Sequence, residues 1–160
     1  MNFDISTLFA WLKNPGLAAM ATSAFSLLFG LHSIDIILAS LGAFIGWGVF
    51  QSLPQMGSPV FAAFLAALTA GFYSEIAGWI RSRPATVYII ASIIPLVPGG
   101  GMYYTMLSTL EGDSMRTVEL FMTTLMSAFA LAAGLAISNA FGRMIFMAHS
   151  HISSRRKAKP

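Results

Sequence analysis

The sequence predicts an all-α integral membrane protein with about five transmembrane helices, the fourth of them broken near its centre. Hydrophobic residues make up 56% of the chain and charged residues only 9%, whereas charged residues average about 25% in soluble domains. The apolar residues gather into long runs, and about 20 apolar residues suffice to cross a bilayer. One run, residues 84–110, is uncharged yet holds prolines and consecutive glycines at its middle.

The first expected span, residues 4–31, is the least regular. Asn14-Pro15-Gly16 interrupts it, and proline removes a backbone donor from a helix. Two interpretations stay open: one bent span, which we favour, or an initial segment, residues 3–12, that lies in the membrane interface and leaves four spans. We expect no removable signal peptide, because no basic region followed by a small-residue cleavage site is found at the start.

Two regular spans follow, over residues 35–53 and 59–80. Ser33 and Asp35 are typical of a helix start. In Ser58-Pro59 a capping serine precedes a proline at the first helical position, which is where helices accept proline best.

The fourth span, residues 85–110, contains Pro95, Pro98 and the run Gly99-Gly100-Gly101. Each glycine destabilises a helix by about 1 kcal/mol relative to alanine, so a helix that only crossed the bilayer would not concentrate such residues at mid-depth. Broken backbone at that depth is tolerated only where protein or a water-filled cavity satisfies it, and broken helices build the substrate sites of secondary transporters. The alternative is a proline kink whose glycines serve close packing.

A polar loop with Gly112-Asp113 leads to the fifth expected span, residues 119–147. We treat residues 1–148 as one transmembrane domain and residues 149–160 as a basic cytoplasmic tail. Cytoplasmic segments carry excess lysine and arginine, so five spans place the N-terminus outside and the C-terminus inside. With four spans the N-terminus moves inside. The basic residues on the C-terminal side are Arg81, Arg83, Arg143, Arg155, Arg156, Lys157 and Lys159, against Lys13 and Arg116 on the other.

Small residues recur at every fourth position of several spans. Residues four apart share a helix face, and small faces let helices approach closely in lipid. The stripes therefore predict tight packing, either within one chain or, as we favour, also against another subunit. The clearest stripes are Ala62, Ala66, Ala70, Ser74 and Gly78 in the third span and Ala130, Gly134, Ser138 and Gly142 in the fifth.

Glu75 is the only carboxylate placed within a span rather than at its edge. An ionisable residue inside the membrane is costly and is a functional candidate by default. Glu75 lies beside the small stripe of the third span, so we expect it to face protein and to couple transport to protons. The alternative is a structural ion pair with Arg81 or Arg83.

The glycine run precedes a second half-helix, and a helix N-terminus attracts anions through free N–H groups and the helix dipole. A small carboxylate-bearing substrate could dock there without a basic side chain. The tyrosines that follow could close over it, or could simply anchor the helix at the interface. The predicted substrate-binding residues are Pro95, Pro98, Gly99, Gly100, Gly101, Tyr103, Tyr104 and Thr105.

Several other function classes lack the residues they need. The chain has no cysteine and only three histidines, none with the spacing of a metal site. No catalytic constellation and no phosphate-binding loop is visible, so we expect no enzyme activity and no cofactor. The positive residues cluster at span ends, which indicates the bilayer rather than nucleic acid as their partner.

Residues 81–105, R-S-R-P-A-x-V-Y-x-x-x-S-I-I-P-L-V-P-G-G-G-M-Y-Y-T, resemble the small YjjB-like half of the threonine/serine exporter (ThrE-type) family. The I-P-L-V-P-G core is the specific part. The acid-containing span before it, the Gly112-Asp113 loop and the small-residue last span extend the likeness over most of the chain.

The resemblance implies the small subunit of a two-component secondary transporter in the bacterial cytoplasmic membrane. Such a transporter would export threonine, serine or similar amino acids at the expense of the proton gradient, and a larger YjjP-like membrane subunit would complete it as a hetero-oligomer. Two alternatives are an assembly or stabilising subunit that carries no substrate, and an exporter of small dicarboxylates.

Overall fold

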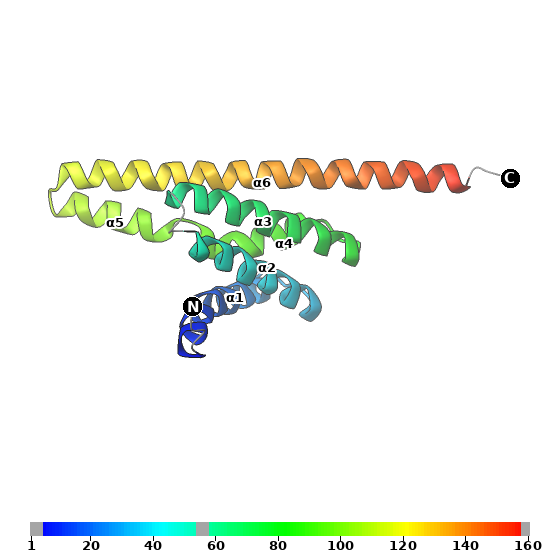
Figure 1. Ribbon diagram of the computed structural model, residues 1–160, viewed down its shortest axis with the longest axis horizontal. Helices are drawn as coiled ribbons and strands as arrows, with labels where there is room; N and C mark the ends of the chain where they lie inside the picture. The colour runs from blue at the N-terminus through cyan, green and yellow to red at the C-terminus, as the bar shows by residue number, and fades with distance from the viewer. Residues whose placement is uncertain (1–4, 54–57, 158–160) are drawn as a thin grey trace.

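The computed structural model describes residues 5–53 and 58–157, and within these residues all regular structure is helical. Figure 1 shows α6 as one long rod, with the remaining helices on one side of it; of these, α3 and α5 pack against it. The elements are α1 (Ile5–Leu28), α2 (Ser33–Ser52), α3 (Pro59–Arg81), α4 (Thr86–Ile93), the 3-10 turn η1 (Ile94–Leu96), α5 (Gly99–Leu110) and α6 (Ser114–Lys157).

Four helical segments among the described residues are long and apolar enough to cross a membrane. They are Ser33–Ser52, Pro59–Arg81, Thr86–Leu110 and Ser114–Gly142. The prediction of an all-α, multi-pass membrane fold is therefore confirmed, together with the break in the span that α4 and α5 form.

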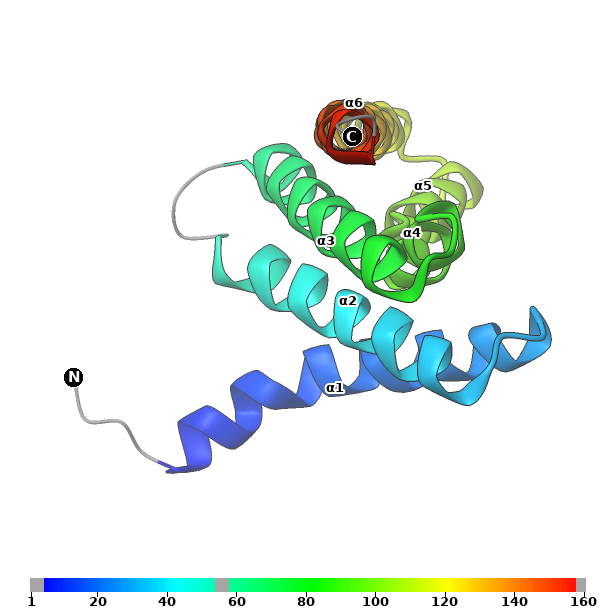
Figure 2. The ribbon, with the colours of Figure 1, turned by 90° about the vertical axis from the view of Figure 1, so that its right-hand side faces the viewer.

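The first predicted span is a single helix, α1, which runs through Pro15 without interruption. It does not belong to the four segments that meet the length and apolarity needed to span a bilayer. Figure 2 looks along α6 and shows α1 from the side, so the two axes lie at a large angle. A fifth membrane crossing by α1 stays a prediction.

Local capping explains both ends of α3 and the start of α6. The Ser58 hydroxyl accepts a hydrogen bond from Val60 N (3.1 Å) as predicted, and Ser82 ends α3 in the left-handed conformation at φ 51°. Arg116 N donates to Asp113 Oδ1 (3.0 Å), and such a cap starts a helix. For this reason α6 begins at Ser114, ahead of the predicted Glu119. At its other end, α6 continues beyond the predicted end of the fifth span, through the predicted tail to Lys157.

The small stripe of α6 meets α3 inside the chain, at the row of small residues with Ala67 and Gly71 that lies beside the predicted α3 stripe. A Cβ added to Gly134 of α6 would lie 2.6 Å from the carbonyl oxygen of Phe64 in α3. One added to Gly71 of α3 would overlap Ser138 of α6. Backbone contact this close between two membrane helices requires small residues, so the α6 stripe packs within one chain. The predicted α3 stripe faces α2 and α4 instead: a Cβ on Gly46 of α2 would lie 3.2 Å from Ala70 Cβ, and Ser74 Oγ lies 3.4 Å from Ser92 Oγ of α4.

Gly134→Val is expected to lower the thermal unfolding temperature of the purified protein strongly. The new side chain would force α3 and α6 apart, and overpacking of this kind costs about 1–3 kcal/mol. Gly16→Ala in α1 is the matched control, because no heavy atom lies within 4 Å of a Cβ at that position. Equal unfolding temperatures for both variants would contradict the observed α3–α6 contact.

Candidate functional site

The break in the fourth span lies where the sequence predicted it, and the structure forms it as a 3-10 turn followed by a new helix. α4 ends at Ile93, η1 carries Pro95, and Pro98 is the residue before the first turn of α5. Leu96 fixes the break in place, because it is buried in the core cluster of α3 and α6 and approaches Gly46 of α2.

The three glycines after the break differ in their surroundings. Gly99 and Gly100 are exposed, and no heavy atom lies within 4 Å of a Cβ built on either. A Cβ on Gly101 would overlap the Thr124 hydroxyl of α6. Close packing therefore accounts for the glycine at position 101. At Gly99 and Gly100 the backbone is accessible to a ligand or to another protein.

The predicted tyrosines lie on the outside of α5. Tyr103 and Tyr104 are 62% and 54% exposed, with their rings edge to face at a centroid distance of 5.3 Å. Thr105 donates its hydroxyl to Gly101 O of its own helix (2.8 Å). Among the described helices α5 packs against α6 alone, and Figure 1 shows this hairpin extending past the ends of α2 and α3. Of the predicted substrate-binding residues, Gly99, Gly100, Tyr103 and Tyr104 are thus exposed on α5, whereas Pro95 lies in η1 and Gly101 packs against α6.

Glu75 is half-buried and faces α6. The sequence predicted a protein-facing position for it without identifying the helix. A Cβ on Gly142 would overlap the Glu75 carboxyl group. Glycine at position 142 therefore makes room for this carboxyl group between α3 and α6.

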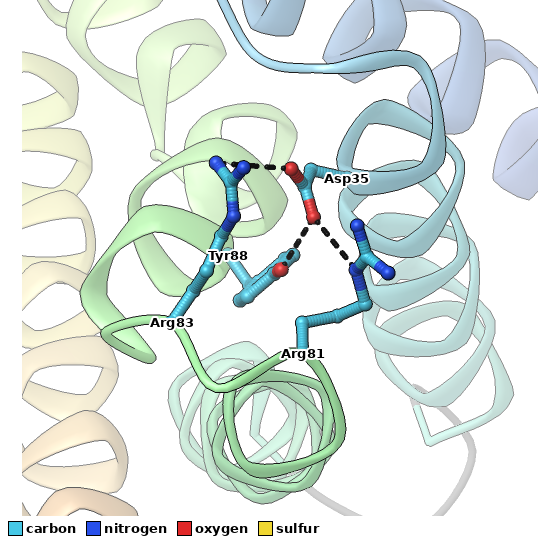
Figure 3. A network of polar contacts seen from close by, with 4 residues as sticks. All are labelled: Asp35, Arg81, Arg83 and Tyr88. Carbon is cyan, nitrogen blue, oxygen red and sulfur yellow. Dashed lines mark hydrogen bonds and ion pairs between the residues drawn. The ribbon is translucent and has the colours of Figure 1, made fainter.

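A second polar cluster, which the sequence interpretation missed, joins the start of α2 to the end of α3 (Figure 3). Asp35 is fully buried and its Oδ1 accepts hydrogen bonds from Tyr88 Oη (2.7 Å) and Arg81 Nε (3.3 Å). Arg83 Nη1 forms an ion pair with Asp35 Oδ2 at 3.2 Å. We call Asp35, Arg81, Arg83 and Tyr88 the Asp35 cluster.

The sequence pattern predicts only a helix-start role for Asp35, and it offers Arg81 and Arg83 as alternative partners of Glu75. The ion pairs of both arginines among the described residues go to Asp35 instead. The available signal was topological: antiparallel neighbours bring the start of one span and the end of the next to the same membrane side. An aspartate at one of these ends and two arginines at the other therefore indicate an ion pair between them.

Neither a groove beside α1 nor a metal-type cluster offers a rival site among the described residues. A groove of about 550 Å³ lies between α1, α2 and α3, with almost entirely apolar walls and none of the predicted site residues. Within the described residues, no group of three or more histidine, aspartate or glutamate side chains is placed to hold a metal ion. The groove is lined by Trp11, Phe44, Ile45, Gly48, Val49, Ser52, Leu53, Leu65 and Thr69.

Comparisons with known proteins point to one family. The family model described as "Threonine/Serine exporter, ThrE" matches residues 16–159. A threonine/serine exporter from Corynebacterium glutamicum is 28% identical over 111 residues, which cover 69% of this chain and 23% of that relative. The chain thus matches less than a quarter of the relative's length. No solved structure matches significantly.

Proposed function

Since the chain belongs to the threonine/serine exporter family, we propose that it is the small membrane subunit of a secondary transporter that exports small amino acids such as threonine and serine. The observation that carries this proposal is the family match over most of the chain, combined with a span that breaks at two uncovered glycines. Transporters of this type bind substrate at broken helices in mid-membrane.

The substrate carboxylate docks at the start of α5. The first helical hydrogen bond there runs from Met102 N to Pro98 O (3.2 Å), so the N–H groups of Gly100 and Gly101 precede the regular ladder. Such N–H groups and the positive end of the helix dipole attract a carboxylate. Tyr103 and Tyr104, one turn further on, supply hydroxyl groups for the polar part of the substrate.

A larger membrane subunit, YjjP-like, covers the open side of this site. Two observations support it: α5 has only α6 as a neighbour among the described helices, and the matched relative is far longer than this chain. Broken backbone within the bilayer needs protein around it, and in the described part of the chain no heavy atom lies within 4 Å of a Cβ built on Gly99 or Gly100.

Glu75 couples export to the proton gradient in this proposal. Its carboxyl group is half-buried between α3 and α6, and carboxylates that relay protons in transporters lie on such protein-facing surfaces. The protein lies in the bacterial cytoplasmic membrane, with the C-terminus and the Asp35 cluster on the cytoplasmic side, because basic residues favour that side.

Flux of labelled threonine and serine into proteoliposomes under an imposed pH gradient tests the proposal. We expect flux only when this chain and its larger partner are reconstituted together. Flux with the partner alone would contradict a transporting role and favour an assembly subunit. Flux of succinate instead of threonine would favour the dicarboxylate alternative.

A further inference from the structure

The Asp35 cluster carries more positive than negative charge. Two guanidinium groups, Arg81 and Arg83, share the single carboxylate of Asp35, whose third contact, Tyr88, is a neutral donor. Asp35 is completely buried, whereas the side chains of Arg81 and Arg83 are 33% and 42% exposed. One positive charge therefore remains uncompensated within the cluster, on the exposed side of the buried carboxylate.

Most of the hydrogen-bonding capacity of the two arginines is also unused. A guanidinium has five N–H donors arranged to bind carboxylates in a bidentate manner. Among the described residues, Arg81 uses only Nε and Arg83 only Nη1. Asp35 already holds the side chains of Arg81 and Arg83 in place. These side chains therefore lose little conformational entropy when a second carboxylate binds to their remaining donors.

We propose that Arg81 and Arg83 form a first binding site for the carboxylate of the exported substrate, at the end of the bundle where α2 begins and α3 ends. Asp35 is a positioning residue there, and it also competes with the substrate for the same guanidinium groups. The inference rests on the proposed export function. It adds a second carboxylate site. The length of α4 and η1 separates this site from the start of α5, and at 1.5 Å per helical residue that length is about 15–20 Å.

Binding to the purified full chain in nanodiscs of phosphatidylcholine tests the site, with L-threonine, L-threoninol and succinate as probes. Threoninol lacks the carboxylate, so only threonine or succinate is expected to bind. Arg83→Lys is expected to weaken that binding about tenfold, because lysine cannot form the bidentate contact. Arg116→Gln is the matched control and is expected to have no effect, because Arg116 is exposed near the start of α6 and is not part of the Asp35 cluster.

Asp35→Asn separates this proposal from a purely structural cluster. The amide oxygen still accepts from Tyr88 and Arg81, so the arginines stay positioned, but the negative charge that competes with the ligand is lost. Carboxylate affinity is therefore expected to rise about tenfold, which corresponds to the loss of one competing charge-assisted contact. A cluster with only a structural role would lower stability without tightening binding. If Asp35→Asn does not fold, the Arg83→Lys comparison decides the question alone.

The possible results distinguish this inference from the proposed function. No carboxylate binding to the wild type, or equal binding by Arg83→Lys, overturns the arginine site even if threonine flux is normal. Binding of succinate but not threonine, with the expected effects of both variants, supports the arginine site and refutes the proposed substrate. Effects that appear only when phosphatidylglycerol is added would identify a lipid phosphate as the ligand and overturn the inference.

Discussion

Glu75→Gln is expected to abolish threonine flux driven by a pH gradient, while threonine exchange at equal pH on both sides continues. Glutamine keeps the size of the side chain, so the contact of α3 with Gly142 of α6 is preserved, but it can no longer bind and release a proton. Initial rates of labelled threonine in proteoliposomes, with and without the gradient, measure the two activities separately.

Glu119→Gln is the matched control, because Glu119 is an exposed carboxylate near the start of α6. It should leave both activities unchanged. Loss of gradient-driven flux and exchange together would show that Glu75 supports the structure or the substrate site rather than proton coupling. Normal values for both activities would remove Glu75 from the mechanism.

Gly100→Val and Gly101→Val are expected to fail in different ways, although the residues are adjacent. Open space surrounds Gly100, so valine there should leave folding nearly unchanged. Valine at 101 would collide with Thr124 of α6 and should destabilise the α5–α6 hairpin by about 1–3 kcal/mol. Thermal unfolding of the purified chain measures this difference directly.

The threonine affinity of the reconstituted Gly100→Val transporter then tests whether substrate binds at Gly100. If substrate and the partner subunit approach the backbone at this glycine, Gly100→Val should lower threonine affinity by at least about tenfold, equivalent to about 1.4 kcal/mol, without loss of folded protein. Wild-type affinity in Gly100→Val would mean that the first two glycines serve only the turn between the half-helices.

The sequence predicted those features that depend on local rules. Proline and glycine chemistry placed the break in the fourth span, and Ser58 is the cap that its position before Pro59 indicated. The four-residue period of small side chains predicted closely packed helices without saying which would pair, and Gly134 and Gly71 lie at the close contact of α3 with α6.

Features that depend on contacts between distant segments were not predicted. Asp35 is distant in sequence from Arg81 and Arg83, and its helix-start position offered a sufficient local explanation. The early start of α6 depends on the Asp113 cap, which was seen only as part of a polar loop. The different surroundings of Gly100 and Gly101 depend on which side of α5 meets α6, and the sequence of α5 alone does not specify this.

Protection of a single cysteine at the break tests the central claim, that substrate binds where the fourth span is broken. The chain has no native cysteine, so Gly100→Cys creates a unique thiol in the uncovered turn, and Ser114→Cys at the start of α6 is the control. In the reconstituted transporter, threonine or serine is expected to slow maleimide labelling of Gly100→Cys and leave Ser114→Cys unaffected. Equal labelling rates of Gly100→Cys with and without saturating substrate, in a preparation that transports threonine, would contradict the claim.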